Sequence, residues 1–130
     1  SSGLRPTKQR LKICEVLFNR EKTFHFTIND LAKSISEQLN EKISLATVYN
    51  TVHAFKDKGY LKEISINSDK SYFDTNITNH HHFFDEDTNK LIDCEYDDIE
   101  KIIIKKNITG KKINSVEVLI KVASDNQNQN

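Results

Sequence analysis

The stretch Ser44-Leu-Ala-Thr-Val-Tyr-Asn-Thr51 opens a segment whose hydrophobic pattern decides the fold class. Ser44 is a favourable residue to cap the start of a helix, and Gly59 stands where a left-handed C-terminal cap belongs. Between these two caps, apolar residues recur at the helical spacing, namely Leu45, Val48, Val52 and Phe55. The pattern predicts an amphipathic helix whose opposite face carries small, polar and aromatic residues, namely Ala46, Thr47, Tyr49, Asn50, Thr51 and His53.

The sequence on either side of this helix predicts further helices before it and a β-hairpin after it. One helical pattern runs from the Pro6-Thr7 pair to about Arg20, and a second, capped by Thr27 and Asp30, runs to about Leu39. After Gly59 the period changes from 3.6 to 2, with strands predicted over residues 61–66 and 71–74 around a turn. Three helices followed by a hairpin predict a winged helix-turn-helix.

In a winged helix-turn-helix the third helix enters the major groove of DNA. Its outward residues suit this role, because Thr and Ala can meet thymine methyl groups and Asn can pair with adenine. Basic residues near the first helix are expected to lie against phosphates. The alternative is a solvated amphipathic helix with no ligand. The predicted DNA-contacting residues are Arg5, Lys8, Arg10, Ala46, Thr47, Tyr49, Asn50 and His53.

The charge of the chain is zero overall but unevenly distributed. Residues 1–73 hold 12 Lys and Arg against 8 Asp and Glu, whereas residues 74–130 hold 7 against 11. This division favours a polyanion-binding first part and a cation-binding second part, although ordinary compositional variation is the alternative.

Histidines and carboxylates cluster in the acidic part. In the run His80-His81-His82, alternate side chains of an extended segment share a face, so His80 and His82 are expected to point together. Asp74 precedes this run and Asp93 follows a short hairpin, so both can converge on the same point. Imidazoles with carboxylates suit Fe²⁺, Mn²⁺ or Zn²⁺ better than Ca²⁺ or Mg²⁺. The alternative is a solvated loop.

The chain resembles the ferric uptake regulator (Fur) family in three motifs, and the resemblance covers residues 3–122. The motifs are Gly3-Leu-Arg-Pro-Thr-Lys-Gln-Arg10, the helix over residues 44–51, and Ser71-Tyr-Phe-Asp-Thr75 leading to His80-His81-His82. Within the family the chain is most similar to the iron response regulator branch. The resemblance implies a dimeric, metal-responsive DNA-binding regulator of iron homeostasis that binds an A·T-rich palindromic operator and places Tyr49 against a thymine.

The resemblance also implies a metal site that joins the two domains. Asp85 and Thr88 stand where many relatives carry the first cysteine pair of a structural zinc site, so that zinc site is expected to be absent. His81 and Glu100 fit a second metal site or a haem site. Fe²⁺ or Mn²⁺ is expected at the main site, with Zn²⁺ binding in vitro. The implied ligands of the main site are His25, Asp74, His80, His82 and Asp93.

The resemblance and the pattern together predict an α+β chain with two domains. The winged-helix domain covers residues 1–75, an αβ metal-binding and dimerisation domain covers 76–123, and residues 124–130 form a disordered polar tail. In the second domain we expect a hairpin around residues 87–89, a helix from Asp97 to about Asn107 and a strand from Ile113 to Val122.

Several other function classes are disfavoured by the sequence. There is no apolar run of membrane-spanning length and no signal peptide, so we expect a cytoplasmic protein. A hydrolytic metalloenzyme using the His and Asp cluster lacks a recognisable catalytic motif, so no enzymatic activity is expected. Two alternatives stay open, namely a peroxide- or manganese-sensing regulator of the same family and a metal-independent winged-helix module that binds DNA.

Overall fold

The computed structural model describes residues 7–95 and 97–125. The chain divides into two compact units, Ser1–Ile77 and Thr78–Asn130, each of which is described here by itself. The boundary predicted from the sequence lies after residue 75. Arg5 and most of the predicted polar tail lie outside the described residues.

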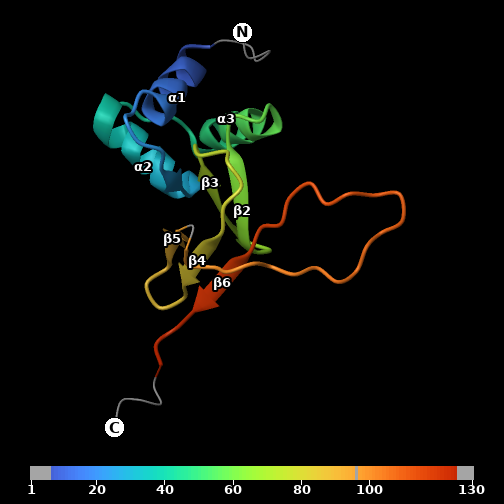
Figure 1. Ribbon diagram of the computed structural model, residues 1–130. Helices are drawn as coiled ribbons and strands as arrows, with labels where there is room; N and C mark the ends of the chain where they lie inside the picture. The colour runs from blue at the N-terminus through green and yellow to red at the C-terminus, as the bar shows by residue number, and fades with distance from the viewer. Residues whose placement is uncertain (1–6, 96, 126–130) are drawn as a thin grey trace. The chain divides into compact units, whose positions relative to one another are not determined.

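The first unit contains the three predicted helices, α1 (Lys8–Phe18), α2 (Ile28–Leu39) and α3 (Leu45–Asp57) (Figure 1). Each helix begins directly after the residue whose side chain caps it. Thr7 Oγ1 accepts a hydrogen bond from the backbone N–H of Arg10, and Ser44 Oγ accepts one from Thr47. At α2 the Thr27 and Asp30 side chains each accept from the other's backbone N–H, which confirms the predicted capping box.

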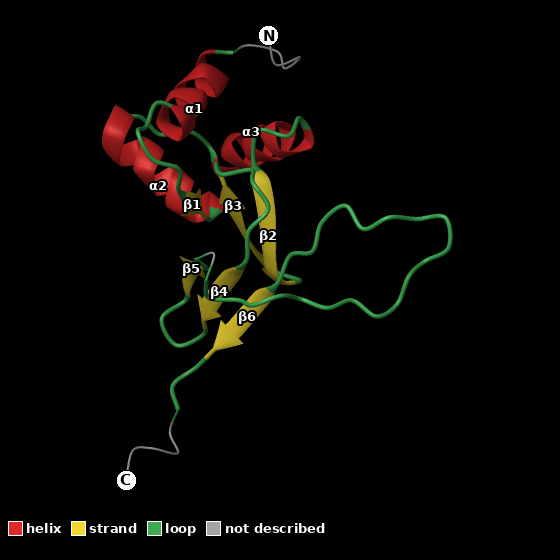
Figure 2. Cartoon of the chain, in the orientation of Figure 1, coloured by secondary structure: helices red, strands yellow, loops and turns green. Residues whose placement is uncertain are grey.

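The sheet of the first unit contains the predicted hairpin and one strand that sequence analysis missed. Strands β2 (Lys62–Asn67) and β3 (Lys70–Asp74) form the hairpin, and β1 (His25–Phe26) pairs with the other edge of β3 (Figure 2). Both pairings are antiparallel. Two residues are too few for an alternating pattern to be visible, so β1 forms because β3 offers a partner edge.

The core of the first unit lies between the three helices and β3. Val48 and Val52 of α3 have no exposed surface, and Phe73 of β3 is 2% exposed. Two expectations for α3 were wrong. Thr51 is 1% exposed because it lies three residues after Val48 on the buried face, whereas Leu45, in the first turn, is 51% exposed.

The second unit is a three-stranded sheet with strand order β5-β4-β6. The predicted hairpin joins β4 (His82–Asp85) to β5 (Lys90–Asp93), and Asn89 in its turn adopts a left-handed conformation with φ of 55°. Strand β6 (Leu119–Val122) pairs in parallel with β4, so residues 94–118 form the crossover between β5 and β6. The strand predicted from Ile113 is therefore four residues long rather than ten.

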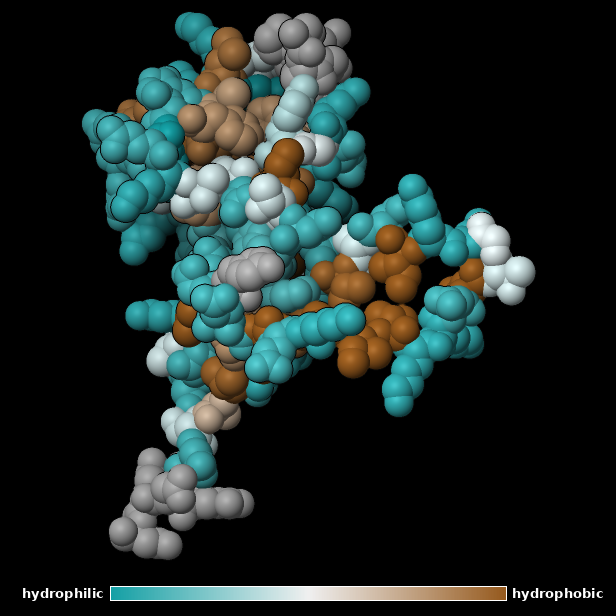
Figure 3. Space-filling view, viewed as in Figure 1, coloured by the Kyte–Doolittle hydropathy of each residue, from teal (hydrophilic) through white to brown (hydrophobic). Residues whose placement is uncertain are grey.

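The helix predicted from Asp97 to Asn107 is absent, because residues 97–118, all of them described, contain no helix. Three consecutive isoleucines disfavour a helix, since β-branched side chains lose rotamer freedom there. An amphipathic helix also needs an apolar surface to cover. Figure 3 shows hydrophobic side chains exposed along this segment. Its exposed large apolar residues are Ile102, Ile103, Ile104, Ile108 and Ile113.

Among the described residues, no helix has both the length and the apolar character needed to cross a membrane.

Candidate metal and nucleic-acid sites

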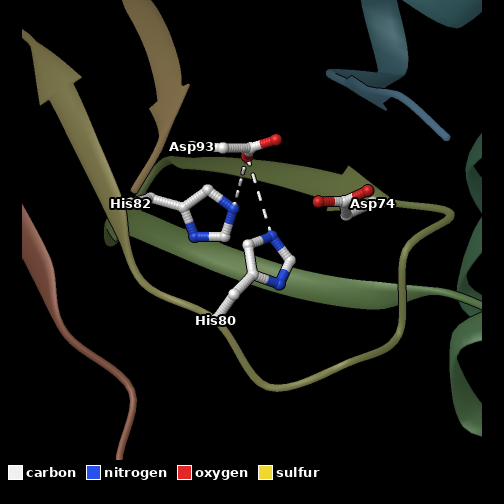
Figure 4. A group of neighbouring side chains, drawn as sticks. All are labelled: Asp74, His80, His82 and Asp93. Atoms are coloured by element: carbon white, nitrogen blue, oxygen red, sulfur yellow. Dashed lines mark ion pairs between the residues drawn. The ribbon is translucent and has the colours of Figure 1, made fainter. Parts of the chain in front are cut away.

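Two histidines and an aspartate meet at one end of the β4–β5 hairpin. His82 begins β4 and lies opposite Asp93, the last residue of β5, while His80 lies two residues before β4. Asp93 Oδ1 is 3.2 Å from His82 Nε2 and 3.7 Å from His80 Nε2 (Figure 4). The prospective ligand atoms of the three side chains lie within 4.8 Å of one another. The structure thus brings together three of the five predicted metal ligands within the second unit.

The backbone before β4 fixes the imidazole of His80. His80 Nδ1 lies 2.8 Å from the carbonyl oxygen of Thr78, and because a carbonyl only accepts, Nδ1 carries the proton. The remaining ring nitrogen, Nε2, therefore presents its lone pair on the side of Asp93. A histidine that donates one N–H to a backbone carbonyl while directing its other nitrogen to a shared point has the arrangement of a metal ligand.

Burial and charge at this group suit a borderline divalent ion. His82 is 4% exposed, whereas the Asp93 side chain is about half-exposed, so the group opens to solvent on the carboxylate side. The neighbouring thiol is a poorer donor, because burial, followed by the carboxylates of Asp98 and Asp93, raises the pKa of Cys94. The donor set is thus imidazole and carboxylate, which fits Fe²⁺, Mn²⁺ or Zn²⁺.

The other two predicted ligands form a pair in the first unit. His25 is the first residue of the short strand β1 and lies directly opposite Asp74 in the β1–β3 pairing. Asp74 is 2% exposed and accepts a hydrogen bond of 2.8 Å from the backbone N–H of Asn76. The ring of His25 contacts the edge of Tyr72, with ring centroids 6.0 Å apart.

His81 has a different environment from its two neighbours. Its Nδ1 accepts a hydrogen bond of 2.9 Å from the backbone N–H of Val118, and its carbonyl accepts one of 3.0 Å from Cys94. His81 thereby connects β4 to the segments that flank β5 and β6. It lines a hollow of the second unit with Glu100, but no group of three metal-type ligands among the described residues includes either of them.

The predicted DNA-contacting residues of the third helix lie mostly on its exposed side. Ala46 and Asn50 are exposed, and Tyr49 is 51% exposed. Thr47 is half-buried, and its hydroxyl accepts a hydrogen bond of 2.8 Å from Ser44. His53 is half-buried beneath Tyr49. On α1, Lys8 is exposed and Arg10 is half-buried.

Glu63, which is absent from the residues predicted from the sequence, connects the β2–β3 hairpin to α3. Its carboxylate lies 3.3 Å from the ammonium of Lys56 on α3. The hydroxyl of Ser71 on β3, and after it Lys56, lower the pKa of Glu63 against the opposing effect of burial. The pattern of a hairpin strand predicts that an outward-facing glutamate is solvated, and no spacing in the sequence indicates a partner on α3.

Comparisons with known proteins agree with this architecture. The ferric uptake regulator of Vibrio cholerae has a TM-score of 0.70 and 23% identity, covering 95% of this chain and 94% of its own. A structure of the ferric uptake regulator from Pseudomonas aeruginosa with manganese has a TM-score of 0.69 and 24% identity, covering 95% and 92%. At these identities the likeness shows the fold, and it confirms the α+β winged-helix prediction.

Sequence relatives extend the comparison. The peroxide-responsive repressor PerR of Staphylococcus aureus strain Mu50 is 34% identical over 101 residues, or 78% of this chain. This chain spans 66% of that relative's length. The model of the Ferric uptake regulator family matches residues 1–122. These matches agree with the prediction of a regulator rather than an enzyme, and the chain belongs to the ferric uptake regulator family.

Proposed function

We propose that this protein is a cytoplasmic, homodimeric transcription regulator whose affinity for double-stranded DNA depends on a bound divalent metal. The observation that carries the proposal is the group of His80, His82 and Asp93, in which a backbone carbonyl presets the imidazole of His80 for metal. The winged-helix unit would contact DNA through α3. The fold and the family membership support both the metal-binding and the DNA-binding part of the proposal.

The regulatory metal would take ligands from both units. His25 and Asp74 are paired across β1 and β3 in the first unit, and the second unit contributes the group around His82. Five residues lie between Asp74 and His80 in the sequence, and the six peptide units that connect them reach at most about 20 Å when extended. A bound ion would supply positive charge that attracts the donors of both sets.

Metal binding of this kind favours one arrangement of the two units over others. A ligand shifts a conformational equilibrium only by its differential affinity for the competing states. An ion that takes ligands from both units would bind more tightly to an arrangement in which all of the donors can reach it. It would bind less tightly to an arrangement in which the donors of only one unit can reach it. That arrangement would then set the spacing of the two α3 helices of a dimer on a palindromic operator.

The exposed crossover of the second unit supports the dimer. Five isoleucines of the segment are between 37% and 70% exposed, which is unusual for a continuous stretch of a protein that acts alone. Among the described residues, β6 pairs with β4 alone, so its other edge is not covered by a strand. A second copy would cover both features, and cyclic dimers are the commonest symmetric assemblies.

The signal to which the protein responds has two further candidates. The Staphylococcus aureus relatives are named peroxide-responsive repressors, which favours a peroxide-sensing role in which metal-catalysed oxidation modifies a ligand such as His25. The likeness of His80-His81-His82 to the iron response regulator branch favours haem. Among metals, Fe²⁺ and Mn²⁺ match the donor set as regulatory ions, and Zn²⁺ is expected to bind in vitro.

A single titration series tests the proposal. Fluorescence anisotropy measures the affinity for an A·T-rich dyad at one fixed salt concentration, with metal-stripped protein, Mn²⁺-loaded protein, Fe²⁺-loaded protein exposed to peroxide, and haem-treated protein. Tight binding only after metal loading supports the proposal, and loss of binding by the Fe²⁺ form in peroxide identifies the peroxide-sensing variant. Tight binding by stripped protein that haem weakens identifies the haem-responsive variant. Equal affinity in every state would contradict metal control.

A further inference from the structure

A ladder of aromatic rings connects the surface of α3 to the core of the first unit. Tyr49 and His53 lie four residues apart on the same side of α3, and their ring centroids are 4.2 Å apart with the planes tilted by 38°. His53 in turn meets Phe73 of β3 edge-to-face, at 5.3 Å and 78°. Phe73 is stacked on Phe26 of β1 at 6.1 Å. The exposed tyrosine is thus the outermost ring of a continuous series.

The burial of these rings gives His53 a supporting position. Tyr49 is 51% exposed, His53 is half-buried and Phe73 is 2% exposed. An exposed aromatic side chain on a helix samples several rotamers unless a neighbour contacts its ring. His53 provides that contact, and its own ring is held by a core phenylalanine. The imidazole packs against the ring of Tyr49, and about half of the surface of the tyrosine stays exposed.

The surrounding charges hold this arrangement against the hairpin. Glu63 of β2 interacts with Lys56 of α3 at 3.3 Å and with the hydroxyl of Ser71. A smaller electrostatic contribution from His53 also lowers the pKa of Glu63. The segment of α3 that bears His53 is therefore fixed to β2 and β3 by polar contacts as well as by ring contacts.

We infer that His53 is a positioning residue that holds the ring of Tyr49 in the orientation in which it contacts DNA, rather than a DNA-contacting residue itself. The inference rests on the proposed function in taking Tyr49 to contact DNA. Fixing the tyrosine before binding removes the cost of ordering one side chain at the interface. That cost corresponds to about 2- to 10-fold in affinity.

The first test examines Tyr49 without DNA. NMR of the full chain compares the ring signals of Tyr49 in the wild type, His53→Ala and His53→Phe. We expect His53→Ala to shift and average these signals, because the neighbouring ring is gone, and His53→Phe to restore distinct signals. Unchanged Tyr49 signals in His53→Ala would overturn the inference, whatever the protein does with DNA.

The second test is a double-mutant cycle on DNA. The duplex is the one that Mn²⁺-loaded wild-type protein selects from a random-sequence library, and Tyr49→Ala, His53→Ala and the double variant are measured on it at several salt concentrations. We expect His53→Ala to weaken binding by about 2- to 10-fold in the presence of Tyr49 and to have no effect in its absence. His53→Phe should recover the wild-type affinity.

The outcomes separate the inference from the function on which it rests. Wild-type protein that selects no duplex contradicts the proposed function, while the NMR comparison still decides whether His53 orders Tyr49. Additive effects of the two substitutions would overturn the inference alone. The slope of the logarithm of the binding constant against the logarithm of the salt concentration is the further readout. A slope that becomes shallower by about 0.9 in His53→Ala would also overturn the inference, because that change marks the loss of a direct phosphate contact.

Discussion

Replacing His82 by alanine is expected to abolish most metal binding, whereas the same change at the adjacent His81 is expected to spare it. His82 Nε2 faces the carboxylate of Asp93 at 3.2 Å. His81 instead uses Nδ1 to accept the N–H of Val118, so its Nε2 carries the proton and offers no lone pair. The two neighbours therefore form a matched pair for testing which imidazoles bind metal.

The magnitudes follow from these two environments. Loss of an outer-shell partner costs about 10- to 100-fold in metal affinity, so loss of a direct ligand is expected to cost at least about 100-fold, or about 2.7 kcal/mol. His81→Ala leaves the half-buried N–H of Val118 without its acceptor, which costs about 1–2 kcal/mol of stability. His81→Asn supplies an oxygen acceptor in the same region and should recover much of that stability.

The assay is the binding of Mn²⁺, followed by electron paramagnetic resonance of the free ion, combined with thermal unfolding of each metal-stripped variant. We expect less than about a tenfold loss of affinity in His81→Ala and His81→Asn. A similar loss of affinity in His81→Ala and His82→Ala would refute the assignment. So would a His82→Ala protein that binds Mn²⁺ as tightly as the wild type.

Three further predictions concern the wing, the cap of α3 and the exposed crossover. Because the folded-state pKa of Glu63 lies below its ordinary value of 4.5, its stabilisation is present above pH 4.5 and is lost as the pH falls through the lower folded value. Glu63→Gln should therefore cost about 1 kcal/mol at neutral pH in chemical denaturation, with the difference from wild type vanishing in acid. Gly59→Ala should cost about 1–2 kcal/mol from backbone strain alone, since φ is +83° and no atom lies within 4 Å of the added Cβ; a much larger loss in thermal unfolding would contradict this. Ile103 is 70% exposed, so Ile103→Lys should change the free energy of unfolding of the monomer by less than about 0.5 kcal/mol. Sedimentation should show a weaker dimer for this variant, and an unchanged dimer would show that Ile103 lies outside the interface.

The helices of the first unit could be predicted because their signals are local. The caps at Thr7, Thr27 and Ser44 act over three residues, and the spacing of Val48 and Val52 reports one helix face. These interactions involve residues that are close in the sequence, so the sequence displays them directly. The left-handed residue that ends α3 is visible for the same reason, since Gly59 adopts φ of +83° without steric cost.

The crossover of the second unit could not be predicted from local signals. The spacing of Ile99, Ile102 and Ile103 suits a helix face, but a marginal helix forms only when a partner surface covers that face. The sequence contains the pattern and says nothing about whether such a surface is available. In the structure the segment is an irregular connection that carries the chain from β5 to a strand parallel to β4.

The sequence by itself determined the identity of the metal-type donors and the relation of His80 to His82, because alternation along an extended segment is a local property. Only the tertiary structure decided that Asp93 stands opposite His82, that His25 stands opposite Asp74, and which imidazole serves the backbone instead. The pairing of His25 with Asp74 and the bond between His81 and Val118 join segments 49 and 37 positions apart, and the pairing of His82 with Asp93 depends on the register of the β4–β5 hairpin. Register follows from the packing of the whole sheet rather than from the residues that it brings together.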